Sequence, residues 1–277
     1  MKGAAVAPDS GFSAGRLGLW LLAVLTMVFL LAPIVVIVVV SFNDTALFAF
    51  PPHRWSWRWY IALWESRAWR EAGWLSLWLA SSVALASLAL GVPAAYGLVR
   101  GRFAGRRIVE AALISPMVVP VIVLALGLYM LFSSAGLVGT PLALFLAHTL
   151  LALPVVIIIV GAAFRRTDAS LELAARSCGA SFPRALWHVV IPSVRPAIIS
   201  AAAFAFLTSF DEVVLTLFLG GPRTVTIPKK IWESVKFELD PSLTGVSTIL
   251  IVVSVIAMLI VELARRDRRR LVSGEKH

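Results

Sequence analysis

Long stretches without a charged residue constrain this chain more than any other feature. No Asp, Glu, Lys or Arg occurs from Leu17 to Asn43 or from Ala111 to Phe164. In water such stretches could not shield their apolar side chains, whereas a helix of about 20 apolar residues crosses the hydrocarbon core of a bilayer. The mean hydropathy of +0.91 and the charged fraction of 14% agree with this interpretation. The sequence therefore predicts an all-α integral membrane protein.

Six apolar stretches are long enough to cross a membrane. The first exceeds the apolar region of a signal peptide, which has about 7 to 15 residues, so we expect it to be a retained span. The uncharged stretch after Ala111 is too long for one span, and the Gly, Ser and Pro residues of 133–141 predict a turn within it. The predicted spans are 17–43, 74–99, 111–132, 142–164, 197–219 and 242–261.

Basic residues lie in short clusters beside these spans. This distribution disfavours nucleic-acid binding despite a formal net charge of +10, because a nucleic-acid site needs a continuous basic face. With six spans, both termini lie on one side of the membrane, and that side carries 17 of the 25 Lys and Arg residues. Both termini are therefore predicted to be cytoplasmic. The predicted domains are a tail over 1–16, a transmembrane domain over 17–264 with a cytoplasmic loop at 165–195, and a basic tail over 265–277.

Tryptophan is concentrated between the first two predicted spans. Five tryptophans occur within 44–71, and Trp74 follows directly. Because tryptophan prefers the boundary between headgroups and water, we expect an extramembrane loop with a helix lying on the bilayer surface. An aromatic cage for a cation is the alternative.

The predicted cytoplasmic loop contains an amphipathic stretch over 171–192, LELAARSCGASFPRALWHVVIP. Asp168 is a plausible N-cap for a first helix whose apolar face comprises Leu171, Ala174, Ala175 and Cys178. Gly179 can end this helix in the left-handed conformation. Ser181 can cap a second helix, closed by Pro192, whose apolar face comprises Phe182, Leu186, Val189 and Val190. We expect an exposed bracket for a partner, with a linker lying on the membrane as the alternative.

Cys178 is the only cysteine in the chain. A single cysteine excludes an internal disulfide and any multi-cysteine metal site. We expect Cys178 to be a small buried residue.

The order of residues in this stretch resembles the EAA loop of the inner-membrane permeases of bacterial ATP-binding-cassette (ABC) importers. The sequence ELAA from Glu172 is followed after three residues by Gly179, and nine residues later by VVIP, which ends at Pro192. The six spans, SPMVVP at 115–120 and SFDEVVLTLFLGGPRTVTIP at 209–228 extend the resemblance to second-subunit permeases of spermidine and putrescine importers. The resemblance implies the type I ABC importer permease fold in the bacterial inner membrane, with a cytoplasmic coupling helix that fits a cleft of an ATPase subunit.

The resemblance also assigns the residues that couple this loop to the ATPase. They are Glu172, Ala174, Ala175, Gly179, Phe182 and Pro192. Six residues before the glycine, where the family most often has a glutamate, this chain has Leu173. Glu172 lies one position earlier, about 100° around a helix, so its contact with the ATPase is an open question.

Energy for transport is expected to come from partner proteins. No GxxxxGK[ST] pattern occurs, so we expect a non-catalytic permease that binds no cofactor, with ATP and Mg on the partner. The resemblance implies an ABC ATPase dimer, a second homologous permease and a periplasmic substrate-binding protein as partners. Whether the permease pair is homodimeric or heterodimeric is left open.

Asp211 and Glu212 lie inside the predicted fifth span. A carboxylate in a bilayer is costly unless it faces water or a partner, so both are candidates for the substrate path, with Asp211 preferred. The alternatives are a pairing with the partner permease or an interruption of the span. A small cationic solute, spermidine or putrescine, is the expected cargo. Many polyamine permeases carry an acidic residue directly after the proline of the third span, whereas in this chain Pro120 is followed by Val121. Because one anionic site is then missing, an opine, an amino-acid derivative or ferric iron is the alternative cargo.

An intramembrane hydrolase and a stand-alone secondary transporter are the alternatives to an importer subunit. An intramembrane hydrolase would need a base, and His148 with Ser115 or Ser134 is the only candidate; a lone histidine among apolar residues more often bonds a neighbouring helix. A stand-alone secondary transporter would suit the intramembrane carboxylates, but the internal repeats typical of such proteins are not evident.

Overall fold

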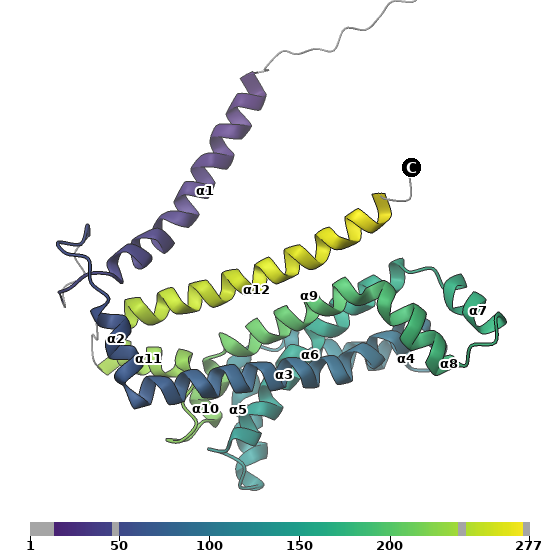
Figure 1. The fold of residues 1–277 in the computed structure, drawn as a ribbon. Coiled ribbons are helices and arrows are strands. Elements are labelled where there is room, and N and C mark those ends of the chain that lie inside the picture. Colours follow the sequence, from purple (N-terminus) through teal and green to yellow (C-terminus); the bar gives the residue numbers. More distant parts are fainter. Residues whose placement is uncertain (1–13, 46–49, 238–241, 274–277) are drawn as a thin grey trace, which may run out of the picture. The chain divides into compact units, whose positions relative to one another are not determined.

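The structure, a computed structural model, describes residues 14–45, 50–237 and 242–273 and consists almost entirely of helices (Figure 1). In chain order these are α1 (Ala14–Val40), α2 (Arg58–Glu65), α3 (Arg67–Arg100), α4 (Arg106–Val118), α5 (Val121–Ser134), α6 (Pro141–Arg166), α7 (Ser170–Ser177), α8 (Phe182–Ala185), the π-helical turn η1 (Leu186–Val190), α9 (Ile191–Phe210), α10 (Val214–Leu219), α11 (Ile227–Phe237) and α12 (Ser242–Ser273). Within the described ranges, β structure is limited to one bridge between Asn43 and Trp55. The all-α prediction is confirmed.

The chain divides into two compact units. The first comprises residues 1–61 and 241–248, and the second comprises 62–240 and 249–277. In the part of the chain that the structure describes, five helical stretches are long and apolar enough to span a membrane: 17–40, 67–100, 141–166, 182–210 and 242–263. The remaining predicted span, 111–132, corresponds to the bent pair α4 and α5, which makes a sixth if it is one span.

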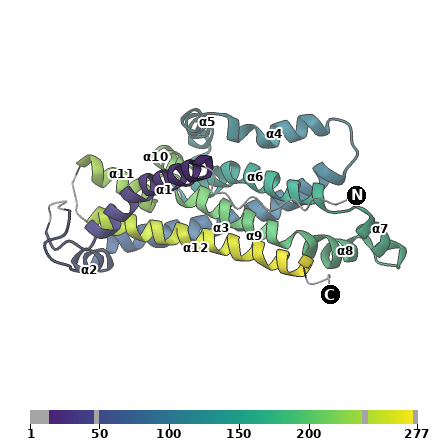
Figure 2. The same ribbon diagram turned by 90° about the horizontal axis from the view of Figure 1, so that it is seen from above.

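The core of the second unit lies between α3, α6 and α9, which run side by side in both ribbon views (Figures 1 and 2). Large side chains such as Leu79, Leu144 and Phe164 are fully buried there. Small residues let the helices approach closely: a Cβ added at Gly91 would lie 2.7 Å from a methyl carbon of Val156. Close approach through small residues is the usual way in which membrane helices pack.

The predicted span at 111–132 is wrong in its bounds and shape. The helix begins at Arg106, stops at Val118 and resumes at Val121, and the two halves meet at 104°. Figure 2 shows α4 along the bundle and α5 nearly end-on. Val119 is extended because it precedes Pro120, which disfavours a helical conformation in the residue before it. The predicted turn at 133–141 is confirmed, with Gly136 and Gly139 at positive φ.

The predicted span at 197–219 is also divided. α9 ends at Phe210, and α10 begins only at Val214; we call residues 211–213 the acidic break. The interruption considered for this span is therefore present. Beyond α10, the predicted loop at 223–240 contains α11, which sequence reasoning did not predict. Its residues 238–240 lie outside the described part of the chain.

The aromatic segment of the first unit folds back on the end of α1. Phe42 lies against the rings of Trp55, Trp57 and Tyr60, and the hydroxyls of Tyr60 and Ser41 are 2.7 Å apart. A short helix is present as expected, but Trp69 belongs to α3, together with Trp74 of the predicted span 74–99. The predicted tail at 1–16 lies almost entirely outside the described residues, and the basic tail begins within α12, where side chains after Leu263 are not described.

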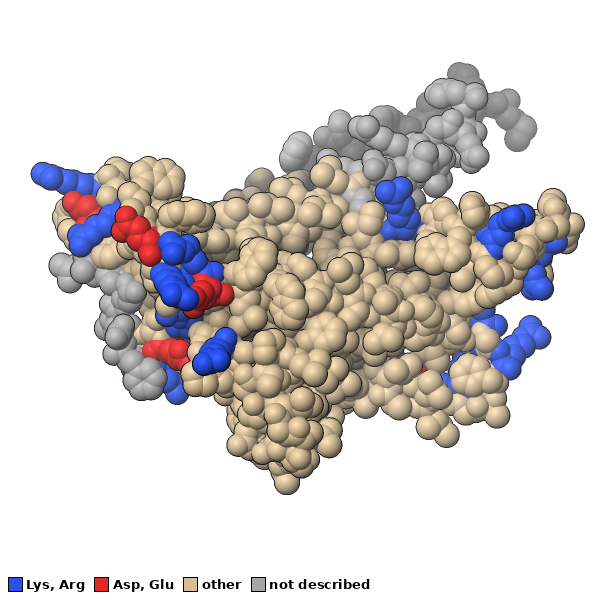
Figure 3. All heavy atoms as spheres, turned by 60° about the horizontal axis from the view of Figure 1, so that its bottom comes forward, with Lys and Arg blue, Asp and Glu red and all other residues tan. Residues whose placement is uncertain are grey.

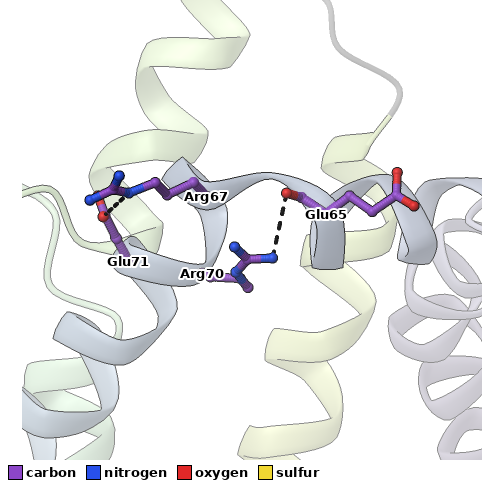
Figure 4. A network of polar contacts seen from close by, with 4 residues as sticks. All are labelled: Glu65, Arg67, Arg70 and Glu71. Carbon is purple, nitrogen blue, oxygen red and sulfur yellow. Dashed lines mark hydrogen bonds and ion pairs between the residues drawn. The ribbon is translucent and has the colours of Figure 1, made fainter.

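On the face drawn in Figure 3, charged side chains of the second unit gather mostly at its two ends, with a broad surface of uncharged residues between them. At the joint of α2 and α3, Arg67 donates to Glu71 at 2.7 Å, and Arg70 donates to the carbonyl oxygens of Trp64 and Glu65 (Figure 4). Both signs of charge occur at this end, whereas the opposite end, at α7 and α8, is mostly basic (Figure 3). The uncharged surface is what a bilayer requires of a protein that crosses it.

Candidate functional site

The first candidate site is the segment 165–195, which we call the bracket. The Oδ1 atom of Asp168 accepts the backbone N–H of Ser170, the first residue of α7, at 2.9 Å. Asp168 thus supports the start of the helix, although the N-cap position itself is Ala169. Hydrogen bonds from the backbone N–H and the side chain of Ser170 hold the pKa of the Asp168 carboxyl below its ordinary value.

Gly179 ends α7 as predicted, with a φ of +91°. The N–H of Ala180 donates to the carbonyl of Ala175 at 3.1 Å, and the N–H of Gly179 donates to that of Arg176 at 3.0 Å. These paired bonds are the usual hydrogen-bonding pattern of a helix that ends in a left-handed glycine. They pair two of the last carbonyl groups of α7 without help from any side chain.

Pro192 does not close the second helix, contrary to the prediction. The helix continues from Phe182 to Phe210 through η1, and Pro192 is the second residue of α9. A proline inside an α-helix clashes with the carbonyl four residues earlier. The wider turn at Leu186–Val190, where the N–H of Ile191 donates to Leu186, gives the chain a local adjustment of the kind that membrane helices use around proline.

Much of the predicted apolar face of α7 lies at the surface. Leu171 is 49% exposed, and Ala174 and Cys178 are exposed as well, so the expectation of a buried Cys178 is wrong. Ala175 is half-buried. On the second helix, Val190 is buried in the core and Leu186 packs against it, whereas Phe182 is 43% exposed. The bracket therefore presents small and apolar side chains outward.

Glu172 points into its own chain. Its Oε2 atom accepts the hydroxyl of Tyr96 on α3 at 2.8 Å, and Glu172 is half-buried. Beside it, Arg100 donates to the carbonyl oxygen of Thr167. Sequence reasoning missed Tyr96 entirely and treated Arg100 only as a topology signal, because nothing local relates residues that lie so far apart in the chain. Leu173, one position from Glu172, is 61% exposed.

The second candidate site is the acidic break, where the structure separates the two carboxylates. Asp211 is exposed and lines an open groove of about 420 Å³, whose other lining residues are Val213, Pro228, Ile231, Trp232, Val235 and Leu250. Glu212 turns toward the start of α10, and its Oε1 atom accepts the N–H of Leu215 at 3.0 Å. Asp211, the preferred candidate, is thus the carboxylate that faces open space.

His148 holds the two sides of the acidic break. It is fully buried on α6, with Nδ1 at 2.9 Å from the hydroxyl of Ser209 and Nε2 at 3.3 Å from that of Thr216. The hydrolase pairs considered above are not formed, since Ser115 and Ser134 donate to carbonyl oxygens of their own helices. As expected for a lone histidine among apolar residues, His148 bonds neighbouring helices. Among the described residues, no three His, Cys, Asp or Glu side chains are placed to hold a metal ion.

Relatives with assigned names align with most of this chain. The putrescine transport system permease protein PotI of Escherichia coli K12 is 32% identical over 264 residues, which cover 91% of this chain and 94% of PotI. The spermidine/putrescine permease PotC of the same organism is 30% identical over 247 residues, 89% of this chain and 93% of PotC. A probable molybdenum ABC transporter permease of Haloferax volcanii is 34% identical over 187 residues, 64% of this chain and 68% of that protein.

Solved structures share the fold. A chain of a bacterial ABC transporter that imports the acidic polysaccharide alginate superposes with a TM-score of 0.70 at 20% identity, covering 94% of this chain and 99% of that one. A chain of the inward-facing methionine transporter MetNI gives a TM-score of 0.57 at 18% identity, covering 71% and 92%. These identities show the fold alone, and they confirm the predicted ABC importer permease fold.

The family match covers the part of the chain that holds both candidate sites. Residues 87–270, which include the bracket and the acidic break, match the family described as binding-protein-dependent transport system inner membrane component. Together with the apolar helices, this makes the protein a multi-pass membrane protein. The chain belongs to the binding-protein-dependent transport system inner membrane component family.

Proposed function

We propose that this chain is a transmembrane permease subunit of an ATP-driven ABC importer for a small cationic solute, of the putrescine and spermidine class. A periplasmic binding protein delivers the solute, and a second homologous permease completes the path. An ABC ATPase dimer, which carries ATP and Mg, supplies the energy. The permease itself catalyses no reaction, and both of its termini lie in the cytoplasm.

The single observation that carries this proposal is the bracket. It projects from the basic end of the second unit, and the apolar side chains of Leu171, Ala174 and Cys178 are exposed on α7. An exposed apolar face on a short helix is a surface for a protein partner. In a family of importer subunits, the partner on the cytoplasmic side is the ATPase, and the excess of basic residues at this end favours that sidedness.

The groove at Asp211 supports a cationic cargo. The exposed carboxylate of Asp211 and the indole ring of Trp232 both line it, and the ammonium of Lys236 lies 4.9 Å from the centre of that ring. An anionic oxygen and an aromatic face are the two groups that attract an alkylammonium ion. The polyamine relatives PotI and PotC point to the same cargo class.

The second candidate function is import of a different cargo, because the names of the relatives do not all give the same solute. One relative is a probable molybdenum ABC transporter permease. The other cargoes that the sequence suggests, an opine, an amino-acid derivative or ferric iron, therefore belong in the substrate panel.

Uptake by the whole complex tests the proposal. The chain is reconstituted in vesicles with its ATPase, second permease and binding protein, and uptake of putrescine, spermidine, an opine and ferric iron is measured. We expect ATP-dependent uptake of the polyamines, and none when the catalytic lysine of the ATPase is replaced. Uptake that continues without the ATPase would identify a secondary transporter instead.

Docking of the bracket has its own test. Cys178 is the only cysteine of this chain and is exposed, so a photoreactive maleimide can be attached there. We expect the label to cross-link to the ATPase subunit. A label that reacts only with lipid or with the second permease contradicts the proposed docking surface.

A further inference from the structure

Tyr96, in the last turns of α3, contacts three separate parts of the bracket region. Its hydroxyl donates to Glu172 on α7 at 2.8 Å. Its ring lies edge-on to that of Phe164 near the end of α6, with centroids 5.6 Å apart, and 6.0 Å from the ring of Phe182 at the start of α8. One side chain therefore joins both short helices of the bracket to the membrane core.

A second contact strengthens this attachment. Arg100, one turn beyond Tyr96, donates to the carbonyl oxygen of Thr167 in the link between α6 and α7. The end of α3 is thus bonded to the bracket at two points, Thr167 before α7 and Glu172 within α7. A hydrogen bond that a hydroxyl donates to a carboxylate is among the stronger ones, and this one is partly shielded from water.

α3 also reaches the region of the acidic break. Near its other end, the hydroxyl of Ser76 accepts the N–H of Ile227, the first residue of α11, at 2.8 Å. α11 contributes Pro228, Ile231, Trp232 and Val235 to the groove at Asp211. Between these two attachments, α3 is packed along α6 and α9. α3 is one continuous helix from Arg67 to Arg100, with Pro93 inside it, and a continuous helix fastened near both ends can pass a displacement from one end to the other.

We infer that Glu172 is a positioning residue that fastens the bracket to α3 through Tyr96, rather than a charged contact to the ATPase. Displacement of the bracket then moves the end of α3, while Leu171, Ala174 and Cys178 face the partner. This inference rests on the proposed function, in which the bracket docks on the ATPase. The family most often has a glutamate at the position of Leu173, and the neighbouring Glu172 does not replace it as a contact of the ATPase, because its side chain is hydrogen-bonded within this chain.

The experiment uses the complete reconstituted complex and compares four single variants and one double variant. Tyr96→Phe removes the hydroxyl but keeps the ring contacts with Phe164 and Phe182. Glu172→Ala removes the acceptor, whereas Glu172→Gln keeps a carbonyl oxygen in its place. Tyr129→Phe is the matched control, because it removes a hydroxyl from α5, which packs on α10 and α6 and not on the short helices of the bracket.

We expect Tyr96→Phe and Glu172→Ala each to lower the stimulation of ATP hydrolysis by loaded binding protein by about tenfold, the scale of one hydrogen bond to a charged group. Cross-linking from Cys178 to the ATPase stays at the wild-type yield, which shows that the complex has assembled. Glu172→Gln retains most of the stimulation, and Tyr129→Phe retains all of it. The double variant Tyr96→Phe with Glu172→Ala falls no further than either single variant, because both remove the same bond.

Three results would overturn the inference. They are wild-type stimulation in Tyr96→Phe, a loss of Cys178 cross-linking in Glu172→Ala, and additive losses in the double variant. The second would make Glu172 a contact of the ATPase. A wild-type complex in which Cys178 never cross-links to the ATPase would instead refute the proposed function, so the two failures are distinguishable.

Discussion

The bracket and the acidic break both interrupt the helices of this protein, but they are held by different means. In the bracket, α7 is ended by backbone hydrogen bonds around Gly179, and most of its side chains are exposed. At the acidic break, a fully buried imidazole, His148, bonds hydroxyls on both sides of the gap. Water can satisfy polar groups at the bracket, whereas an apolar core leaves them dependent on protein partners. The bracket is therefore accessible to a partner, whereas buried hydrogen bonds fix the positions of the two helix ends at the acidic break.

The largest expected effect is the loss of His148. His148→Ala leaves a cavity and removes the partner of the Ser209 hydroxyl, whereas the Thr216 hydroxyl keeps its bond to the carbonyl oxygen of Glu212. We expect this to cost about 3 kcal/mol of stability. The exposed His188 of the bracket is the matched control, and His188→Ala should change stability by less than about 0.5 kcal/mol. Unfolding of the purified protein in detergent measures both. Equal losses of stability in the two variants would show that the acidic break does not depend on a buried side chain more than the bracket does.

The next effect concerns the charge at the acidic break. Asp211→Asn should lower uptake of the cationic substrate by about tenfold, since a contact between a charge and its ligand is lost. Glu212→Gln should leave uptake close to wild type, because Glu212 bonds the N–H of Leu215 and not the groove. Uptake is measured in complexes with wild-type cross-linking from Cys178. Wild-type uptake by Asp211→Asn would refute its assignment to the substrate path.

A smaller energetic effect is expected at the end of α7. Gly179→Ala places a Cβ in open space but at a φ of +91°, which should cost about 1–2 kcal/mol. Gly127→Ala in α5 also adds a Cβ in open space, without positive φ, and should be neutral or slightly stabilising.

A charged replacement of Gly179 should have a larger effect on ATP hydrolysis than alanine has. Gly179→Glu should leave the protein in the membrane and abolish substrate-stimulated ATP hydrolysis, because it changes both the bend and the surface of the bracket. Hydrolysis by the reconstituted complex measures this. Stimulation at the wild-type level would show that the bracket does not transmit the ATPase cycle.

The smallest effect is the dependence of α7 on pH. The pKa of Asp168 is lowered by its hydrogen bonds with Ser170, so its support of α7 is complete above the ordinary carboxyl range. That support is lost as the pH falls through the lowered pKa. Amide hydrogen exchange in α7 should therefore accelerate at acid pH relative to Asp168→Asn, whose uncharged side chain does not titrate. The same pH dependence in both proteins would exclude Asp168 as its source.

Sequence patterns predicted the features that depend on local composition. Charge-free stretches marked where helices cross the apolar layer, and the glycines and proline of 133–141 marked the turn between α5 and α6. Gly179 was placed at the end of α7 because only its conformational freedom suits that position. The alternation of charged and uncharged segments and the fold class followed from the cost of exposing polar backbone to lipid.

The features that sequence reasoning missed depend on neighbours from elsewhere in the chain. One span was predicted over 111–132, where the structure has a 104° bend at Val119 and Pro120. A helix end was predicted at Pro192, where the helix continues. Both errors involve a proline. A proline only weakens a helix locally, and packing against other helices decides whether it breaks or continues.

By itself, the sequence determined that this chain crosses a membrane as helices, that it belongs with importer permeases, and where its polar segments interrupt the apolar ones. The tertiary structure alone decided the direction of each polar side chain. It turned Glu172 toward Tyr96, Glu212 toward α10 and Asp211 toward an open groove. The physical reason is that periodicity fixes which side of its own helix a residue occupies, whereas its partner is set by the packing of distant helices.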